Sequence, residues 1–327
     1  MDIIINPTNK CNFNCSFCMA SDLEDKTLTI EKTIELLDKY YTEPGTIIIN
    51  GGDPLMMDPQ YYKDLLSYLN KKFDTPSHLS LTTNLYDWYI HPEKWYDILN
   101  NKNVGVITSF QYGESRRLKT GRIYKVDLFR KVMSKFNETF HYTPDFISVV
   151  DENNQPCAYK TAKLAKDLGV KCKLNKIMTL GRAKYNKYFP WYRMFNIYIN
   201  AIDKGLGKYI SNISNLKSYF SSDGSYCPVC RKCYHGIRAI NNDGKVYPCG
   251  NLTSDEVFNK YDLETGVSSD QFAKDYNMIS FRCLFCENYK LCNSCRSIIC
   301  EVKRFRDEEN YCKQMKKIIP ILKEKLA

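Results

Sequence analysis

The amino-acid sequence predicts an α/β fold built on a parallel sheet. Over about the first two hundred residues, short apolar runs alternate with amphipathic stretches of helical spacing, the pattern of strands followed by covering helices. Six such pairs are expected, too few for a closed eight-stranded barrel. The remainder of the chain differs in composition, because it carries ten of the fifteen cysteines. The sequence therefore predicts an α/β unit followed by a small cysteine-rich unit.

Strands are expected at residues 2–6, 46–50, 79–83, 104–110, 146–150 and 171–178. The run at 46–50 is continuously apolar, as buried parallel strands are. Helices are expected at residues 29–41, 61–73, 128–136, 159–168, 191–202, 206–220 and 304–326. Thr29 or Thr27 is the expected N-cap of the first helix. The composition becomes polar and turn-rich after Phe220, which predicts domains at 1–220 and 221–312 and a C-terminal helix at 313–327.

Composition excludes several classes of protein. No apolar run reaches the length of a membrane span, and no secretory signal precedes the first strand. The cysteines occur in tight clusters, which favours metal binding in a reducing cytoplasm over disulfides. The net charge of +10 fits a lysine-rich solvated surface, and no basic run is dense enough to predict a nucleic-acid-binding patch.

The first cysteine cluster follows the first strand. Cys11, Cys15 and Cys18 are separated by three and by two residues. Thiolates suit iron–sulfur clusters and zinc, but a structural zinc site needs four ligands, and no fourth Cys or His lies near. Three thiolates leave one metal position open for a small molecule. The alternative is a zinc knuckle that borrows a distant fourth ligand.

This spacing, with Phe17 before the last cysteine, resembles the signature loop of the radical S-adenosylmethionine (SAM) superfamily. The resemblance implies an open (βα)6 partial TIM barrel and a [4Fe–4S] cluster held by the three cysteines. It also implies that SAM occupies the fourth iron and is cleaved reductively to methionine and a 5′-deoxyadenosyl radical. An external electron donor of the flavodoxin or ferredoxin type is then expected.

Polar and glycine-rich loops follow the next strands, at the edge where parallel sheets bind ligands. Gly51-Gly52-Asp53-Pro54 resembles the family's Gly-Gly-Glu-Pro loop, which holds the amino group of SAM, with Asp in place of the commoner Glu. Arg116, Arg117 and Arg122 are candidates to pair with the carboxylate of SAM, and Arg122 is favoured. The resemblance implies these SAM-binding residues: Phe17, Gly51, Gly52, Asp53, Pro54, Asn84, Ser109, Gln111 and Arg122.

The later cysteines form two groups around a predicted β-hairpin. The first group is Cys227, Cys230 and Cys233, followed after an Asp-Gly turn by Cys249. The second is Cys283, Cys286, Cys292 and Cys295, with Cys300 and Cys312 beyond. The string resembles the SPASM extension of radical SAM enzymes, except that its last interval is two residues instead of three.

A SPASM domain, a β-hairpin with helices, holds two auxiliary [4Fe–4S] clusters, so the resemblance implies three such clusters in all. The first auxiliary set would be Cys227, Cys233, Cys249 and Cys295, with Cys300 as the alternative to Cys295. The second would be Cys283, Cys286, Cys292 and Cys312. Cys157 and Cys172 fit ordinary core thiols, and Cys230 is either an alternative ligand or a hydrogen-atom donor.

SPASM enzymes mostly modify ribosomally made peptides or proteins, so we expect a maturase that forms thioether or carbon–carbon cross-links. Formylglycine formation is disfavoured, because those maturases carry an Asp after the hairpin cysteine where this chain has Gly250. No winged-helix module for a leader peptide is recognised, so the barrel or a separate leader-binding protein is expected to hold the substrate.

Three alternatives stay open. The first is an epimerase that uses Cys230 as its hydrogen donor. The second is radical SAM chemistry on RNA or a small molecule, which the net positive charge favours. The third is a non-enzymatic iron–sulfur or zinc protein.

Overall fold

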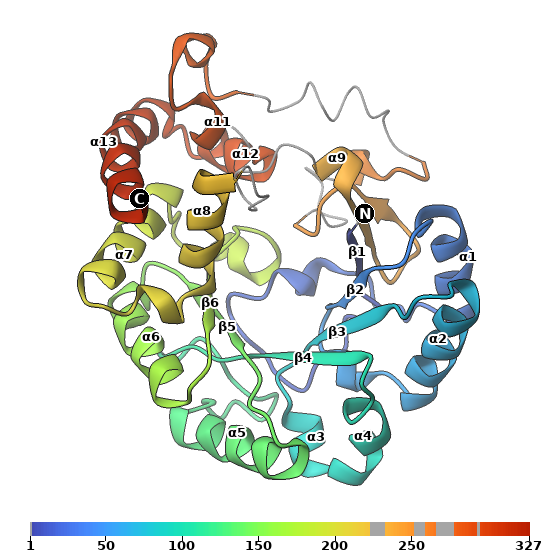
Figure 1. Ribbon diagram of the computed structural model, residues 1–327. Coiled ribbons are helices and arrows are strands. Elements are labelled where there is room, and N and C mark those ends of the chain that lie inside the picture. The colour runs from blue at the N-terminus through green and yellow to red at the C-terminus, as the bar shows by residue number, and fades with distance from the viewer. Residues whose placement is uncertain (1, 223–232, 252–258, 266–277, 293–294) are drawn as a thin grey trace.

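The first part of the chain folds into an open barrel of parallel strands (Figure 1). The structure is a computed structural model that describes residues 2–222, 233–251, 259–265, 278–292 and 295–327. The strands are β1 (Asp2–Ile5), β2 (Thr46–Ile49), β3 (His78–Thr82), β4 (Val104–Ser109), β5 (Phe146–Val150) and β6 (Cys172–Lys176). They pair in sequence order, each parallel to the next. The predicted open six-stranded barrel is confirmed.

Helices cover the outer face of this sheet (Figure 1). They are α1 (Ile30–Tyr40), α2 (Pro59–Lys72), α3 (Tyr86–Ile90), α4 (Pro92–Leu99), α5 (Val126–Phe140) and α6 (Ala158–Asp167). Thr29 is the N-cap of α1, as expected, and its side chain accepts a hydrogen bond from the backbone N–H of Lys32 at 3.2 Å. The sequence pattern did not predict α3 and α4, since Pro92 divides this stretch into two short helices.

The strands bury their two faces unequally. Residues such as Ile3, Ile47 and Leu81 are 0% exposed and pack toward the outer helices, where each buried side chain contributes roughly 1.5–3 kcal/mol. The alternate residues, such as Ile4 and Ile48, are only partly buried. Only the strand at 46–50 was expected to be apolar throughout. The less buried face of the strands leaves space inside the barrel for a site.

The predicted hairpin is present as β7 (Ile237–Ile240) and β8 (Val246–Tyr247). Its first strand pairs in parallel with β1, so the sheet order becomes β6-β5-β4-β3-β2-β1-β7-β8. Asn6 reinforces the junction, because its side chain donates to Asn241 Oδ1 at 2.8 Å. The hairpin expected in a separate domain thus extends the barrel sheet.

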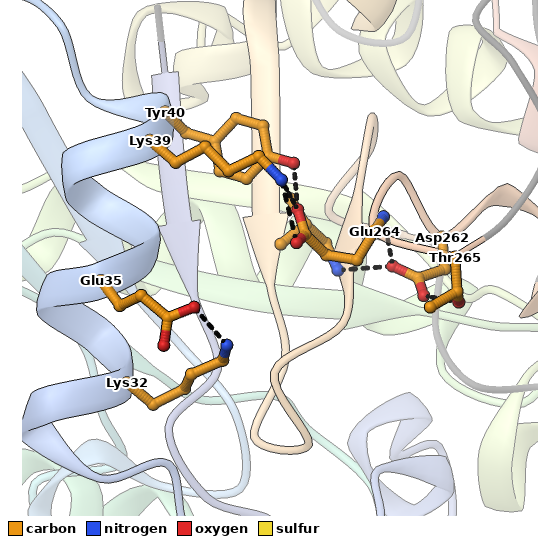
Figure 2. Close-up of polar contacts among 8 residues, drawn as sticks. Lys32, Glu35, Lys39, Tyr40, Asp262, Glu264 and Thr265 are labelled. Atoms are coloured by element: carbon orange, nitrogen blue, oxygen red, sulfur yellow. Dashed lines mark hydrogen bonds and ion pairs between the residues drawn. The ribbon is translucent and has the colours of Figure 1, made fainter.

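A second contact ties the residues after the hairpin to α1 (Figure 2). The carboxylate of Glu264 accepts hydrogen bonds from Lys39 Nζ, at 2.9 and 3.0 Å, and from the hydroxyl of Tyr40. Buried Asp262 accepts from the backbone N–H groups of Val246, at 3.0 Å, and Glu264, at 3.1 Å. Solvent screens the exposed Lys39 pair, so that pair contributes little to stability, and buried Asp262 is the stronger of the two anchors.

The remaining helices lie at the β6 side of the barrel or beside the hairpin (Figure 1). They are α7 (Trp191–Asp203), α8 (Ser211–Ser222), α9 (Cys233–Gly236), α11 (Tyr289–Cys292), α12 (Arg296–Arg304) and α13 (Glu308–Leu326). Helix α13 packs against α7 and α8. The expected limits at 220 and 312 fall inside α8 and α13, and the domain division stays a prediction. Within the described ranges, no helix has the length and apolar character needed to cross a membrane.

Candidate active site

A cavity of about 410 Å³ lies at the carboxyl ends of the barrel strands. Its walls combine the first cysteine loop, the loops after β2 and β3, the inner faces of β4 to β6, and residues from the C-terminal part. The residues expected at the site that line it are Cys11, Cys15, Phe17, Cys18, Gly51, Gly52, Asp53, Asn84, Ser109 and Cys295. The fold thus brings together side chains from distant parts of the sequence.

The loop carrying Cys11, Cys15 and Cys18 is held by the segment that follows β4. The backbone N–H of Asn14 donates to Arg117 O at 2.7 Å, and that of Ser16 donates to Ser115 O at 3.0 Å. The backbone N–H of Phe13 points at Cys11 Sγ, 3.3 Å away. Backbone donors near a cysteine sulfur stabilise its thiolate form.

The chemistry of these thiols fits a metal cluster. Burial, followed by the charge of Asp53, raises the pKa of Cys11 to about 12, so the free thiol keeps its proton at neutral pH and a metal must displace it. Among the described residues, no three Cys, His, Asp or Glu side chains converge on the position of a single metal ion. The ligands of a cubane cluster each bind a different iron, so such convergence is not required of Cys11, Cys15 and Cys18.

The Gly51-Gly52-Asp53 loop packs against the entry to the cysteine loop. A Cβ atom at Gly52 would lie 2.2 Å from Lys10 O and 2.3 Å from Asn9 O, so only glycine fits there. The close approach is to the protein's own backbone. Asp53 is buried, and its carboxylate accepts from Leu55 N at 2.9 Å, from Thr83 Oγ1 at 2.8 Å and from Asn84 N at 2.8 Å.

These contacts give Asp53 a positioning role. Burial raises the pKa of its carboxyl to about 6, while the three donors favour the ionised form. Pro54 begins a short 3-10 helix after it, and Tyr62 donates to Pro54 O at 2.8 Å. The loop is therefore fixed to β3 through Asp53.

Asn84 continues this contact to the cysteine loop. Its side-chain nitrogen donates to Asn12 Oδ1 at 2.8 Å and lies 3.8 Å from Cys11 Sγ, while its oxygen accepts from Tyr86 N at 2.8 Å. The side chain thus fixes the position of Cys11 while it also lines the cavity.

Arg116, and not Arg122, lies in the cavity wall. Its guanidinium donates to Ser109 Oγ at 3.0 Å and lies over the rings of Phe13 and Phe17. Arg122 is exposed and lines a separate outer groove. Gln111 is buried, donates to Ser115 Oγ at 2.7 Å, and is not among the described residues that line the cavity.

Arg116 has an unsatisfied charge within the described part of the chain. It is 6% exposed, has no carboxylate partner there, and its Nε has no hydrogen-bond acceptor. A buried cation without an anion is costly, so this site favours an anionic ligand. The anionic set of cysteine thiolates and the carboxylate of an amino acid both fit that requirement.

The loop after β6 closes on the cysteine loop, a contact that sequence reasoning missed. Gly181 has φ +57°, and a Cβ there would lie 2.5 Å from Cys18 O. Its N–H donates to Asp22 Oδ2 at 2.5 Å, and the N–H of Arg182 donates to Cys18 O at 3.1 Å. Gly181 was a visible signal in the sequence, but nothing in the sequence indicated that it packs against Cys18.

The later cysteines reach the same region. Burial, followed by the charges of Cys286, Cys312 and Cys283, raises the pKa of Cys292 to about 12. Cys295 lines the cavity, whereas Cys300 is buried in α12 within an apolar cluster against which Cys249 packs. Cys233 is partly buried at the start of α9. Cys283, Cys286 and Cys312 thus lie within electrostatic range of Cys292.

The expected ligand Cys227 and the expected hydrogen donor Cys230 lie outside the described residues. Cys172 is buried at the start of β6, where desolvation raises its pKa to about 12. Cys157 is partly buried beside α6. Cys172 therefore has the core role expected for it, whereas Cys157 is only partly buried and belongs to no apolar cluster of the described residues.

A buried ion pair, which no local pattern predicts, joins the barrel to α12. Lys176, at the end of β6, pairs with Glu301, and both side chains are almost fully buried. Lys176 Nζ also donates to Ile177 O at 2.7 Å. The other carboxylate oxygen of Glu301 accepts from Thr179 N at 3.1 Å and Thr179 Oγ1 at 2.8 Å. This network orients α12 next to the cavity.

Parts of this chain are similar to proteins of known families. The family model described as the radical SAM superfamily matches residues 5–165. GTP 3′,8-cyclase of Staphylococcus carnosus (strain TM300) is 25% identical over 306 residues, covering 83% of this chain and 84% of that protein. The GTP 3′,8-cyclase of Staphylococcus haemolyticus (strain JCSC1435) is 24% identical over 304 residues, with 83% and 84% covered.

Solved structures share the fold over nearly the whole chain. A structure of anSMEcpe with bound AdoMet has a TM-score of 0.71 at 16% identity and covers 99% of both chains. A structure of Streptococcus suis SuiB bound to its precursor peptide SuiA has a TM-score of 0.61 at 15% identity, covering 90% of this chain and 71% of that one. At these identities the likeness establishes the fold.

Proposed function

Because this chain belongs to the radical SAM superfamily, we propose that it is a SPASM-type maturase that oxidatively cross-links a ribosomally made peptide or protein. Cys11, Cys15 and Cys18 would hold the [4Fe–4S] cluster, which with SAM supplies a 5′-deoxyadenosyl radical that abstracts a hydrogen atom from the substrate. One observation carries the proposal: the cavity beside these cysteines is also lined by Gly250, Asn251 and Cys295 from the cysteine-rich part.

The oxidative outcome needs an acceptor for the electron left after hydrogen abstraction. Cys283, Cys286, Cys292 and Cys312 would hold one auxiliary [4Fe–4S] cluster, and their proximity supports that set. Cys227, Cys233, Cys249 and Cys295 would hold the other, with Cys300 as the alternative to Cys295. Thiol ligands in this number suit the reducing cytoplasm.

The SAM pocket supports a role for Arg116 in binding the carboxylate of SAM. The conservative variant Arg116→Lys keeps the charge but loses the planar fork that pairs with a carboxylate. We expect its Kd for SAM to rise about tenfold, equivalent to about 1.4 kcal/mol. Isothermal titration with anaerobic holoprotein measures this.

Arg122→Lys is the matched control, because Arg122 lies in the outer groove. Its Kd for SAM should equal that of the unmodified protein. If the Kd for SAM rose more in Arg122→Lys than in Arg116→Lys, Arg122 would be the residue that binds the carboxylate of SAM.

A peptide substrate is supported by what the cavity offers. Several inward groups are uncharged, such as Asn175 and Asn251, and they can hydrogen-bond a peptide backbone. The structure of SuiB was solved with a precursor peptide, and one of anSMEcpe with a Kp18Cys peptide. Gly250 at the cavity wall supplies no side-chain base, which argues against formylglycine formation.

The second candidate is a nucleotide substrate, which the GTP 3′,8-cyclase relatives favour. Three phosphate groups require several cations. The cations among the described residues lining the cavity are Arg116, Lys173 and Lys176. Lys176 is neutralised by Glu301 and Arg116 is assigned to SAM, which leaves Lys173. This charge inventory favours the peptide.

A substrate assay separates the two candidates. Anaerobic holoprotein receives SAM and dithionite together with either GTP or peptides encoded by small open reading frames beside its gene. We expect one peptide to become lighter by two hydrogen atoms in mass spectrometry, with GTP unchanged. Conversion of GTP, with no peptide altered, would contradict the proposal.

The same assay in heavy water tests epimerisation. Cross-linking leaves no solvent deuterium at the modified carbon, and Cys230→Ala should still turn over. A product of unchanged connectivity that carries deuterium, and that Cys230→Ala cannot form, would make the enzyme an epimerase.

A further inference from the structure

Four exposed cations gather on the segment after β4 and on the first turns of α5. They are Lys119, Arg122, Lys125 and Lys131, and we call them the basic face. None of them has an ion-pair partner among the described residues. Arg122, Lys125 and Lys131 line one outer groove of about 310 Å³.

Little acidic charge offsets this face. Asp127 lines the same groove, and Glu114 nearby is neutralised by Arg117 at 2.9 Å. An excess of positive over negative charge on a concave surface raises the local concentration of acidic partners. The basic face therefore fits an acidic macromolecular surface.

The basic face belongs to the segment that holds the cysteine loop. The backbone N–H of Lys119 donates to Asn12 O at 2.9 Å, and Phe13 and Leu118 form an antiparallel bridge. Together with the bonds from Asn14 and Ser16, these contacts connect the basic face to Cys11 and Cys15 through a few residues. A protein docked here would lie outside the barrel, behind the cysteine loop, and would leave the cavity free.

We propose that the basic face is the docking surface for a small acidic one-electron carrier of the flavodoxin type. The proposal builds on the function proposed above, because a donor is needed only if Cys11, Cys15 and Cys18 hold a redox-active cluster. In each reduction the donor flavin would lose one electron, and the cluster that Cys11, Cys15 and Cys18 would hold would gain it. Complementary charge would bring the flavin to the outer side of the cysteine loop and mainly increase the association rate.

The test compares two reductants in the same holoprotein. The rate of 5′-deoxyadenosine formation is measured with reduced flavodoxin at increasing concentration and, separately, with dithionite. In Lys119→Glu/Lys125→Glu/Lys131→Glu, the flavodoxin concentration for half-maximal rate should rise about tenfold or more, while the dithionite rate should stay unchanged. An unchanged flavodoxin requirement overturns the proposal.

A matched control carries the same charge change on another outer helix. Lys160, Lys163 and Lys166 are exposed on α6, and their replacement by Glu should leave both rates unchanged. If the flavodoxin requirement of this control rose equally, the effect would come from the net charge of the protein and not from the basic face, which would overturn the proposal. Absence of 5′-deoxyadenosine with dithionite in the unmodified protein would instead defeat the proposed function.

Salt provides a second measurement that needs no variant. Raising the ionic strength from about 0.1 M to about 1 M shortens the Debye length from about 10 Å to about 3 Å. The flavodoxin-driven rate of the unmodified protein at subsaturating flavodoxin should fall several-fold more than the dithionite-driven rate. Equal salt dependence of the two rates would contradict electrostatic docking.

Discussion

Replacing Cys11, Cys15 and Cys18 together with alanine should remove about four of about twelve iron atoms and abolish SAM cleavage. The physical reason is that these three thiols lie on the loop after β1, whereas the later cysteines are held by other elements, such as α11 and α13. The remaining clusters should therefore persist. Iron and sulfide analysis of anaerobically reconstituted protein measures the loss.

Cys157→Ala is the control for this experiment. Cys157 lies beside α6, outside every proposed ligand set, so its replacement should leave the iron content unchanged. Full iron in the triple variant, or zinc as the metal found, would show that the ligand assignment is wrong.

Glu301→Leu should destabilise the protein by about 3–5 kcal/mol, because it leaves Lys176 buried and charged without a partner. Glu301→Leu also leaves the N–H and hydroxyl of Thr179 without their acceptor. The double variant Lys176→Met/Glu301→Leu should recover much of this loss, since it removes both charges. Urea unfolding of the anaerobic holoprotein measures the free energies.

The pair between Lys325 and Asp203 is a matched control. It spans a similar distance in the sequence and joins α13 to α7, but its side chains are 40% and 45% exposed. Lys325→Met should lower the free energy of unfolding far less than Glu301→Leu does, because solvent screens an exposed pair. If Glu301→Leu lowers the free energy of unfolding no more than Lys325→Met does, the buried pair does not anchor α12.

Local patterns in the sequence were enough to predict most elements of the barrel. The strand at Phe146–Val150 and the hairpin strand Ile237–Ile240 fall where the apolar runs and the Asp-Gly turn predict them. The spacing of Cys11, Cys15 and Cys18 pointed to the site because a metal loop is local in sequence. These signals lie among residues that are close in the sequence, so they can be recognised without a structure.

Features that depend on long-range packing could not be predicted. The choice between Arg116 and Arg122 depends on which way a short hairpin turns its side chains. Lys176 and Glu301 are 125 residues apart, and no local pattern in either segment predicts that they form a pair. Pairing of β7 with β1 likewise requires knowledge of the edge that the barrel leaves open.

The most direct measurement is the release of 5′-deoxyadenosine and methionine by the anaerobically reconstituted protein with SAM and dithionite. We predict equal amounts of the two products in chromatography, formed slowly even without substrate, and none in the variant that lacks Cys11, Cys15 and Cys18. Intact SAM in the presence of a reduced, iron-loaded protein, or equal cleavage by the triple variant, would contradict radical SAM chemistry at this site.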